Sequence, residues 1–462
     1  MKKYLSLFIL FLSFCYIYAQ KVKSYSIKAE FFPHDAQMYG YPVSSRNFMR
    51  GRAKIKFSGR VDIPLAFYLH GELKMDSIKL AGQRIAYDSK KILFSRNYSR
   101  VALKTVTDTL IMAPHDNIKI YYSGFFNPSR ARSLSDYMRI DQGEGVFLRS
   151  YGYSIWFPVF IETGQETYQT NFKEVSLKLH GKFKAVVAGQ KIRGKYENGV
   201  TTSIWRPGKI DIFDLQCTAR DYQIKNKGNI YIYYLEGQHS QAKIDDILNF
   251  ALKIKNFYSR KFRQINQARP LYIMAMPRYG NISNANVIGL SPSVLADFNE
   301  ELSARLTIAH ELVHPYVKIP ISRRDSLFAL VVEGFPGFFH LYGLARVLDK
   351  KSFNLEEYMD RIEKGYLRKR QTGQDRRKNN LPPAKTITSI KADEIGSYKD
   401  KYILNDRVRL FLYDLLKRMG GQKHDDFLNK LFNLERINYV KFKQLILQYL
   451  PDYRKELSIW LN

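Results

Sequence analysis

Cysteine is nearly absent from this chain of 462 residues, which holds only Cys15 and Cys217. Cys15 lies in the first apolar segment, so a single thiol is left for the rest of the chain, and one thiol cannot form an internal disulfide. The length is sufficient for about two or three buried cores. Stability is therefore predicted to come from those cores, with Cys217 as a buried apolar side chain rather than a nucleophile.

Long apolar runs are also scarce. The run from Tyr4 to Tyr18 follows Lys2 and Lys3 and is too short and wrongly flanked for a good bilayer span. Residues 1–19 are therefore predicted to be a secretory signal peptide. No later stretch reaches about 18 uninterrupted apolar residues, so we expect no transmembrane segment after cleavage. The predicted location is secreted, periplasmic or in the cell envelope.

Acidic residues are few beside basic ones. The chain has 43 Asp and Glu against 74 Lys and Arg, a formal net charge of +31. The basic residues are spread along the whole length, which is typical of a solvated exterior. We find no zinc-finger, RNA-recognition or phosphate-loop signature, so nucleic acid is not predicted as a partner.

Two periodicities divide the chain. In the N-terminal half apolar and polar residues alternate, as in residues 53–58, which is typical of strands with two different faces. After Gly237 apolar residues recur every three or four residues, which is typical of a helix, and Ser240 is placed to cap its start. The predicted fold is α+β and multidomain, with a β-sheet domain of mostly antiparallel strands over 20–237 and a mainly helical domain over 238–462.

Within the second domain the pattern predicts one strand, over 271–276, and several helices. A polar stretch over 364–383 is predicted to be a loop or a partly ordered linker. The predicted helices are one from about Ser303, then Asp325–Leu348, Asp406–Met419, Asp425–Leu434 and Tyr453–Leu461.

The segment TIAHELVHPY, residues 307–316, has the residues of a metal site. His310 and His314 are four apart, so on a helix both imidazoles lie on one face and can reach one zinc ion. Glu311 beside them can take a proton from a metal-bound water as a general base. A catalytic zinc needs a third protein ligand and an open fourth position. Glu333, after 18 intervening residues, can supply that ligand.

The bare HExxH pattern also arises by chance in chains of this length, as one turn of an ordinary helix. The acid at a fixed distance makes the metal interpretation specific. One zinc ion is therefore predicted as the cofactor. The other seven histidines are scattered along the chain and are predicted to be structural.

These residues resemble the aminopeptidase N and leukotriene hydrolase family of zinc peptidases, which has HExxH, 18 residues and then Glu in an EGF context. IWFPVF at 155–160 is similar to an element of the family's N-terminal sheet domain, and LSIWLN at 457–462 is similar to the end of its catalytic domain. The resemblance covers most of the mature chain. It implies a saddle-like antiparallel β domain followed by a thermolysin-like, mainly helical zinc peptidase domain.

The resemblance also implies an oxyanion-stabilising tyrosine beyond the third ligand. A phenol suits this role because it donates a strong hydrogen bond where negative charge develops. Tyr402 lies just before Asn405, a predicted helix cap, whereas Tyr398 fits the family spacing better. Both are candidates, and Tyr402 is preferred.

The chain departs from the family in its amine-binding residues. GNISN, residues 280–284, stands where the family has its GAMEN strand. Gly280 and Asn284 can still hold an extended substrate backbone against a strand edge. Ser283, however, replaces the glutamate that binds the free amino group, and Arg149 falls near the second anchor. Because serine and arginine cannot bind an ammonium ion as two carboxylates do, free-amine recognition is predicted to be altered.

A further departure is Pro315, which directly follows His314. Its ring lacks an N–H group and crowds the carbonyl of Glu311. The helix is therefore expected to kink or stop just after His314.

These observations predict an exported zinc-dependent metallopeptidase that hydrolyses peptides or proteins with metal-activated water. The alternative is a non-catalytic, peptidase-like binding protein for acidic surface or polymer ligands. The retained Glu311 argues against this alternative, because a pure binder needs no base. A third possibility is an enzyme that cleaves internal or N-blocked peptides, for which Ser283 and Arg149 are the reason. Residue preference and oligomeric state are not predicted.

Overall fold

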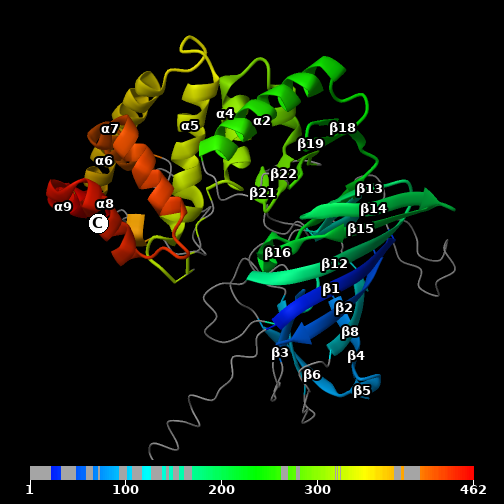
Figure 1. Ribbon diagram of the computed structural model, residues 1–462. Coiled ribbons are helices and arrows are strands. Elements are labelled where there is room, and N and C mark those ends of the chain that lie inside the picture. The colour runs from blue at the N-terminus through cyan, green and yellow to red at the C-terminus, as the bar shows by residue number, and fades with distance from the viewer. Residues whose placement is uncertain are drawn as a thin grey trace, which may run out of the picture. The chain divides into compact units, whose positions relative to one another are not determined.

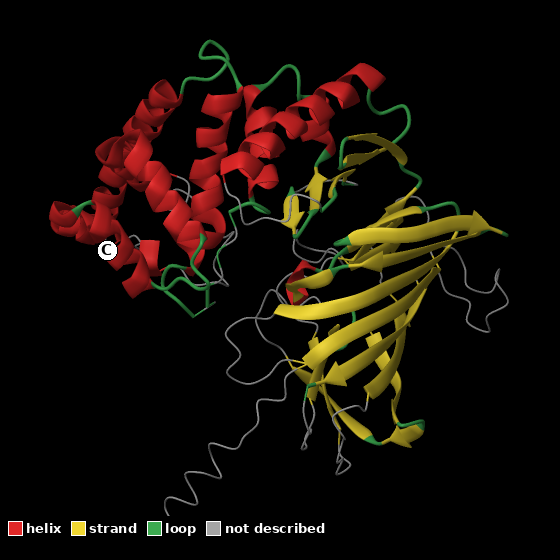
Figure 2. Cartoon of the chain, in the orientation of Figure 1, coloured by secondary structure: helices red, strands yellow, loops and turns green. Residues whose placement is uncertain are grey.

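The chain forms two compact units, which are described separately below. The first comprises Met1–Val187 with Lys191–Arg220, and the second Ala188–Gln190 with Asp221–Asn462. Figure 2 shows strands throughout the first unit and most of the helices in the second. The predicted signal peptide lies outside the described residues. The computed structural model describes residues 22–32, 48–58, 66–70, 73–92, 101–106, 117–125, 138–141, 145–148, 156–160, 169–261, 269–276, 281–317, 319, 321–322, 324–378, 387–389 and 406–461.

The first unit is built on a nine-stranded sheet, counted over the described residues. Two strands make its centre, β1 and β12, and they run parallel to each other, so the sheet is mixed rather than purely antiparallel. In sheet order the strands are β14 (Gln190–Glu197), β15 (Val200–Arg206), β12 (Gln169–His180), β1 (Val22–Phe32), β2 (Phe48–Phe57), β8 (Asn117–Phe125), β4 (Leu73–Leu80) and β5 (Gln83–Ile85), with β16 (Gly208–Asp211) also paired to β12.

Two four-stranded sheets and a short 3₁₀ helix, η3 (Ile212–Asp214), complete the described part of this unit. One sheet has the order β13 (Lys184–Val187), β17 (Cys217–Arg220), β10 (Gly145–Leu148), β9 (Met138–Asp141). The other has the order β11 (Val159–Phe160), β3 (Ala66–His70), β7 (Val101–Val106), β6 (Tyr87–Ile92).

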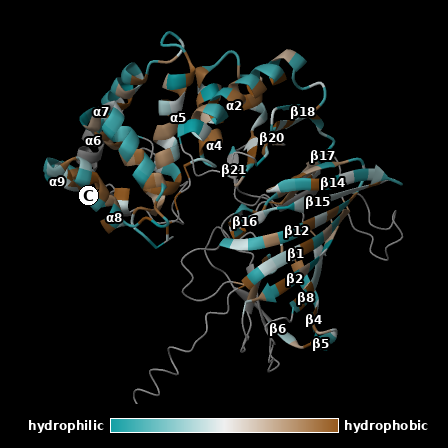
Figure 3. Ribbon diagram, in the orientation of Figure 1, coloured by the Kyte–Doolittle hydropathy of each residue, from teal (hydrophilic) through white to brown (hydrophobic). Residues whose placement is uncertain are grey.

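Alternation of side chains explains the main sheet. Ile27 and Phe31 on β1 are fully buried, while Lys28 between them is exposed. Figure 3 shows polar and apolar residues along β1 and β12. The same alternation on the paired strands gives each strand one apolar face, and these faces form the core. Cys217 is buried as expected, and burial raises the pKa of its thiol.

A charged cluster lies on the other face of the same sheet. Glu30 is opposite Arg50 on β2 and Lys178 on β12. Its carboxylate lies 2.6 Å from Nε of Arg50, 2.8 Å from Nζ of Lys178 and 2.8 Å from Nε2 of buried His180. Burial raises the pKa of Glu30, but the hydrogen bonds from these three side chains outweigh it and lower the pKa to about 2.

The second unit contains a five-stranded sheet. Its order is β18 (Gln223–Lys227), β19 (Ile230–Tyr234), β20 (Leu271–Ala275), β22 (Val287–Leu290), β21 (Ile282–Asn284). The period of the sequence changes at residue 237, but the hairpin β18–β19 before that point already belongs to this sheet. The long segment of the second unit therefore begins at Asp221.

Helices make up most of the second unit (Figure 1). Three of them, α2, α4 and α5, contact one another and form its core. The helices are α2 (Gln241–Lys261), α3 (Pro292–Ala296), α4 (Leu302–Val313), the π-helical turn η4 (Leu330–Gly334), α5 (Phe335–Val347), α6 (Leu355–Lys378), η5 (Ile387–Ser389), α7 (Val408–Phe432), α8 (Tyr439–Tyr449), η7 (Pro451–Tyr453) and α9 (Arg454–Leu461).

Several predicted ends are confirmed. Ser240 Oγ accepts a hydrogen bond from the backbone N–H of Lys243 at 3.2 Å, so it caps α2. Helix α4 ends at Val313, before Pro315. The two helices expected over 406–434 are one element, α7, with a kink at Gly420, where φ is 69°. No helix in the described ranges is long and apolar enough to span a membrane.

The predicted linker over 364–383 is wrong for its first part, because α6 continues to Lys378. Asn354 caps this helix, since its Oδ1 accepts a hydrogen bond from the backbone N–H of Glu356 at 3.1 Å. Glu356 and Glu357 lie in the first turn and the basic residues follow toward the other end. This order of charges matches the helix dipole, so the basic run favours a helix here rather than a loop.

Candidate metal centre

Helix α4 positions the two histidines. Ile308, Ala309 and Leu312 are fully buried, so one apolar face of the helix is fixed against the core. This orientation places His310 and His314 on a neighbouring face of the helix. Their side chains remain 22% and 19% exposed, respectively. A metal ion can therefore reach both rings from solvent.

Glu333 lies in the π-helical turn Leu330–Gly334, directly before α5. Pro336 follows at the start of α5 and has no N–H group to donate to the carbonyl four residues earlier. A wider turn before a proline relieves the crowding of that carbonyl, and single π turns occur often at functional sites. The carboxylate of Glu333 is directed toward the histidines and stays about one third exposed, at 36%.

The three predicted ligands meet at one point. His310 Nε2 and His314 Nε2 lie 3.1 Å apart, and Glu333 Oε2 lies 3.6 Å from the first nitrogen and 3.9 Å from the second. Ligand atoms about 2.0–2.1 Å from a tetrahedral zinc lie about 3.3 Å from one another. The two nitrogens and the oxygen therefore fit a zinc ion in both type and spacing. They are the one group of three or more such side chains found among the described residues.

Glu311 is buried beside this triad, with 8% of the residue exposed. Burial lowers the pKa of His310, but the hydrogen bond to Glu333 and the negative charges of Glu311 and Glu333 outweigh burial, so the pKa is raised. Negative charge thus collects around the imidazoles, which also favours a divalent cation.

His340 was not anticipated as part of this region. Its ring lies 5.3 Å from that of His310, and its Nδ1 is 2.9 Å from the carbonyl oxygen of Pro336. It is buried, and burial together with the charge of Arg409 lowers its pKa well below the usual value. His340 follows Glu333 by about two helical turns, which places both on one helix face. This spacing was the signal in the sequence that His340 lies near the site.

Strand β21 brings the predicted substrate-binding segment close to α4. It is the edge strand of its sheet, because β22 is its neighbour on one side and no described strand pairs on the other. Ser283 lies in this strand, and its Oγ is buried without a hydrogen-bond partner among the described residues. The backbone of Asn284 belongs to the same strand.

The remaining predicted site residues lie outside the described residues. They are the two tyrosine candidates, Tyr402 and Tyr398, and the substrate-binding candidates Gly280 and Arg149. Their roles stay predictions.

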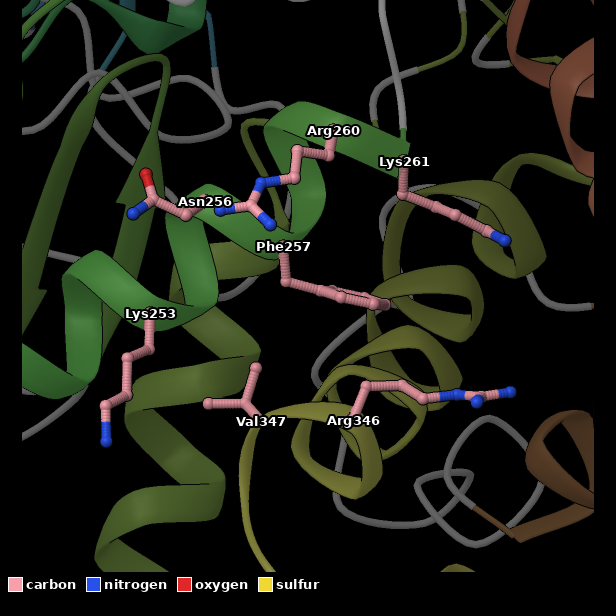
Figure 4. A pocket seen from close by; sticks show the side chains of 7 residues that line it. All are labelled: Lys253, Asn256, Phe257, Arg260, Lys261, Arg346 and Val347. Atoms are coloured by element: carbon pink, nitrogen blue, oxygen red, sulfur yellow. The ribbon is translucent and has the colours of Figure 1, made fainter.

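A cavity of about 410 Å³ lies elsewhere in the second unit (Figure 4). Arg346 at its wall follows Glu333 by 13 residues, or about 20 Å along a helix. Arg260, Lys261 and Arg346 are in the last turns of α2 and α5, where cations complement the helix dipole. The cavity shares no residue with the metal centre; its lining residues are Lys253, Asn256, Phe257, Arg260, Lys261, Arg346 and Val347.

Solved structures share this architecture. An M1 zinc metallopeptidase from Deinococcus radiodurans has 13% sequence identity and a TM-score of 0.64, over 96% of this chain and 94% of that one. A mutant of that peptidase bound to Tyr-Ser-Ala gives 13% and 0.63, over 96% and 94%. Yeast LTA4 hydrolase in complex with bestatin has 11% identity and a TM-score of 0.66, over 96% of this chain and 68% of that chain.

No family model and no curated protein matches the chain. At identities this low the structural likeness is evidence for the fold. The α+β, multidomain prediction is thereby confirmed, and so is the resemblance to the aminopeptidase N and leukotriene hydrolase family at the level of the fold.

Proposed function

We propose that the chain is an exported zinc metallopeptidase that hydrolyses peptide bonds. The observation that carries the proposal is the meeting of His310, His314 and Glu333, at separations suited to one zinc ion, beside the buried carboxylate of Glu311. The fold shared with zinc metallopeptidases supports it. In this proposal the first unit is the saddle-like β domain and the second is the thermolysin-like catalytic domain.

In the proposed mechanism His310, His314 and Glu333 hold the zinc ion. Zinc, when bound, polarises a water molecule and the peptide carbonyl, which makes the water a stronger nucleophile near neutral pH. The Glu311 carboxylate accepts the proton that the water loses as its oxygen attacks the carbonyl carbon. The protonated Glu311 then gives that proton to the amine nitrogen as the C–N bond breaks. Tyr402 or Tyr398 donates a hydrogen bond to the oxyanion.

Strand β21 is the proposed place for the substrate backbone. An edge strand has unpaired N–H and C=O groups, and an extended peptide can pair with them. Ser283 on this strand has no negative charge for an ammonium ion, which supports an altered free-amine site. Because a related peptidase was crystallised with Tyr-Ser-Ala, short peptides of this size are suitable first substrates.

Export is proposed from the N-terminal segment. Lys2 and Lys3 followed by the apolar run to Tyr18 support a signal peptide over 1–19. The enzyme would then act outside the cytoplasm, in the envelope or beyond.

The substitution Glu311→Gln tests the general base. The amide keeps the size of the side chain but cannot accept the proton, so hydrolysis of Tyr-Ser-Ala and of its N-acetylated form should fall by about 10²–10⁴-fold. Zinc content, measured by atomic emission on the purified protein, should stay at one ion per chain.

A matched control is Glu301→Gln, because Glu301 is an exposed carboxylate just before the start of the same helix. This variant should keep the activity of the native protein. Unchanged hydrolysis in Glu311→Gln would refute the role of Glu311. A zinc-loaded native protein that cleaves neither form of the peptide would instead support the non-catalytic binding protein.

A further inference from the structure

Arg409 lies next to the metal centre without belonging to it. It is in the first turn of α7, and its Nε donates a hydrogen bond to the carbonyl oxygen of Gly337 at 2.8 Å. Gly337 follows Glu333 by four residues, about one helical turn. The preceding residue, Val408, packs on Gly334, where an added Cβ would lie 2.6 Å from Val408 Cγ1. The start of α7 is thus held against the segment that carries Glu333.

The charge of Arg409 reaches the histidines. It lowers the pKa of His340 and opposes the rise in the pKa of His310. Burial lowers the pKa of Arg409 itself, and the nearby Tyr358 and Asp406 oppose that effect. A guanidinium remains charged at all physiological pH values, so a permanent cation lies near the centre.

Within the described residues, most of the hydrogen-bonding capacity of this guanidinium is unused. A guanidinium has five N–H donors, and the bond to Gly337 uses the single one on Nε. Arg409 forms no ion pair among the described residues, and other arginines of the same helix differ in this respect, since Arg418 is paired with Asp414. Arg409 is partly exposed as a residue, and none of the buried, unpaired polar atoms of the described chain belongs to it.

A purely structural role would be to join α7 to α5 through Gly337. That role needs one donor and no charge, and a partly buried charge that forms no ion pair among the described residues costs free energy. An accessible guanidinium fixed at one end matches instead the two oxygens of a carboxylate, which it can bind in a bidentate manner.

We propose that Arg409 is a substrate-binding residue that holds a carboxylate of the peptide substrate beside the metal centre. The inference rests on the proposed function and gives its substrate class: peptides with an acidic side chain or a free C-terminal carboxylate near the scissile bond. Recognition has then moved from the free amine, for which Ser283 supplies no charge, to an anionic group.

The test measures binding, so that it does not depend on turnover. Zinc-loaded Glu311→Gln protein is titrated in a calorimeter with three N-acetylated tripeptides of equal length. One is neutral with a C-terminal amide, one is the same peptide with a free C-terminal carboxylate, and one is an amide with a glutamate side chain. We expect one of the two anionic peptides to bind roughly tenfold more tightly than the neutral one, which identifies the source of the carboxylate.

Adding Arg409→Gln should reduce this advantage to less than about twofold while zinc content stays the same. Arg409→Lys keeps a cation but not the planar fork, so it should retain part of the advantage, and it serves if the glutamine variant does not fold. Arg418→Gln, on the same helix, is the matched control and should retain the full advantage.

Equal binding of all three peptides to the Glu311→Gln protein would overturn the proposal. So would an advantage that survives in Arg409→Gln. Failure of the proposed function is recognised by a separate measurement. In that case the zinc-loaded native protein cleaves none of the three peptides. The binding comparison still decides whether Arg409 holds a carboxylate.

Discussion

Two glutamates of the described residues, Glu30 and Glu333, lie within 4 Å of histidine nitrogens, and their surroundings differ. Glu30 has 10% of its side chain exposed and is neutralised by Arg50 and Lys178 as well as by His180. Glu333 has 36% exposed and faces two imidazole nitrogens across 3.6 and 3.9 Å. The first arrangement is a closed ion cluster within a sheet, and the second leaves room for an ion between the ligands.

The Glu30 cluster predicts a loss of stability in acid. The folded pKa is about 2 and the ordinary value is 4.5, so the folded state binds the proton less tightly than the unfolded state. The ionised Glu30 contributes at most about 3 kcal/mol to the free energy of unfolding. This contribution is complete above pH 4.5 and declines as the pH falls toward 2. Thermal unfolding of the native protein and of Glu30→Gln, followed by circular dichroism from pH 7 to pH 3, should show a shallower decline in the variant.

Glu174→Gln on β12 is the control for this measurement, because Glu174 forms no ion pair among the described residues. It should keep the acid dependence of the native protein. A decline in Glu30→Gln as steep as in the native protein would show that other carboxylates are responsible.

At the level of elements, the contact between the π turn and α7 determines how Glu333 is held. An alanine at Gly334 would bring its Cβ within 2.6 Å of Val408 Cγ1, so either α7 or the turn must move. We expect Gly334→Ala to lower the free energy of unfolding by about 1–3 kcal/mol and to weaken zinc binding, because Glu333 moves with the turn. Chemical denaturation and competition with a chelator measure the two effects.

Gly365→Ala in α6 makes the same chemical change in open space, where an added Cβ meets no atom within 4 Å. It should stabilise the protein by about 0.5–1 kcal/mol, because alanine favours a helix more than glycine does. Equal effects of the two substitutions would contradict the role given to the Gly334 contact.

Elements with a strong apolar period were predictable, and those with a weak one were not. The helix starting near Ser303 and the cap at Ser240 follow from local chemistry. Helix α6 was missed in part because its residues are mostly polar, so the cap at Asn354 was the signal that remained. The π turn was not predictable, since a period of 3.6 does not reveal one wider turn.

The grouping of His310, His314 and Glu333 was predictable because HExxH and a distant glutamate form a pattern in sequence. Arg409 and His340 have no such pattern. Arg409 meets Gly337 across 72 positions, and only tertiary packing creates that contact. The three side chains that group in space are thus readable from a sequence pattern, while the contact of Arg409 depends on which helices touch.

At the level of the whole molecule, the formal charge of +31 should destabilise the folded chain at low salt. Like charges repel more in the compact state than in the unfolded chain, and salt screens that repulsion over about 10 Å at 0.1 M. We expect the midpoint of thermal unfolding to rise between about 10 and 150 mM sodium chloride. Sucrose at matched osmolality is the control for effects other than screening.

A midpoint that falls with added salt would mean that attractive pairs such as those around Glu30 outweigh the general repulsion. The composition argues for repulsion, because 74 Lys and Arg outnumber 43 Asp and Glu. If repulsion dominates, the shortage of acidic residues makes the purified protein most stable at the higher salt concentrations.

The turn at Leu330–Gly334 has a consequence for the helix that follows it. A π turn takes in one residue more than an α turn, and the helix beyond it keeps its phase. The buried aromatic residues Phe335, Phe338 and Phe339 can therefore stay in place whether or not the extra residue is present. The wider turn thus sets the direction of the Glu333 side chain, and the packing of the interior does not depend on it.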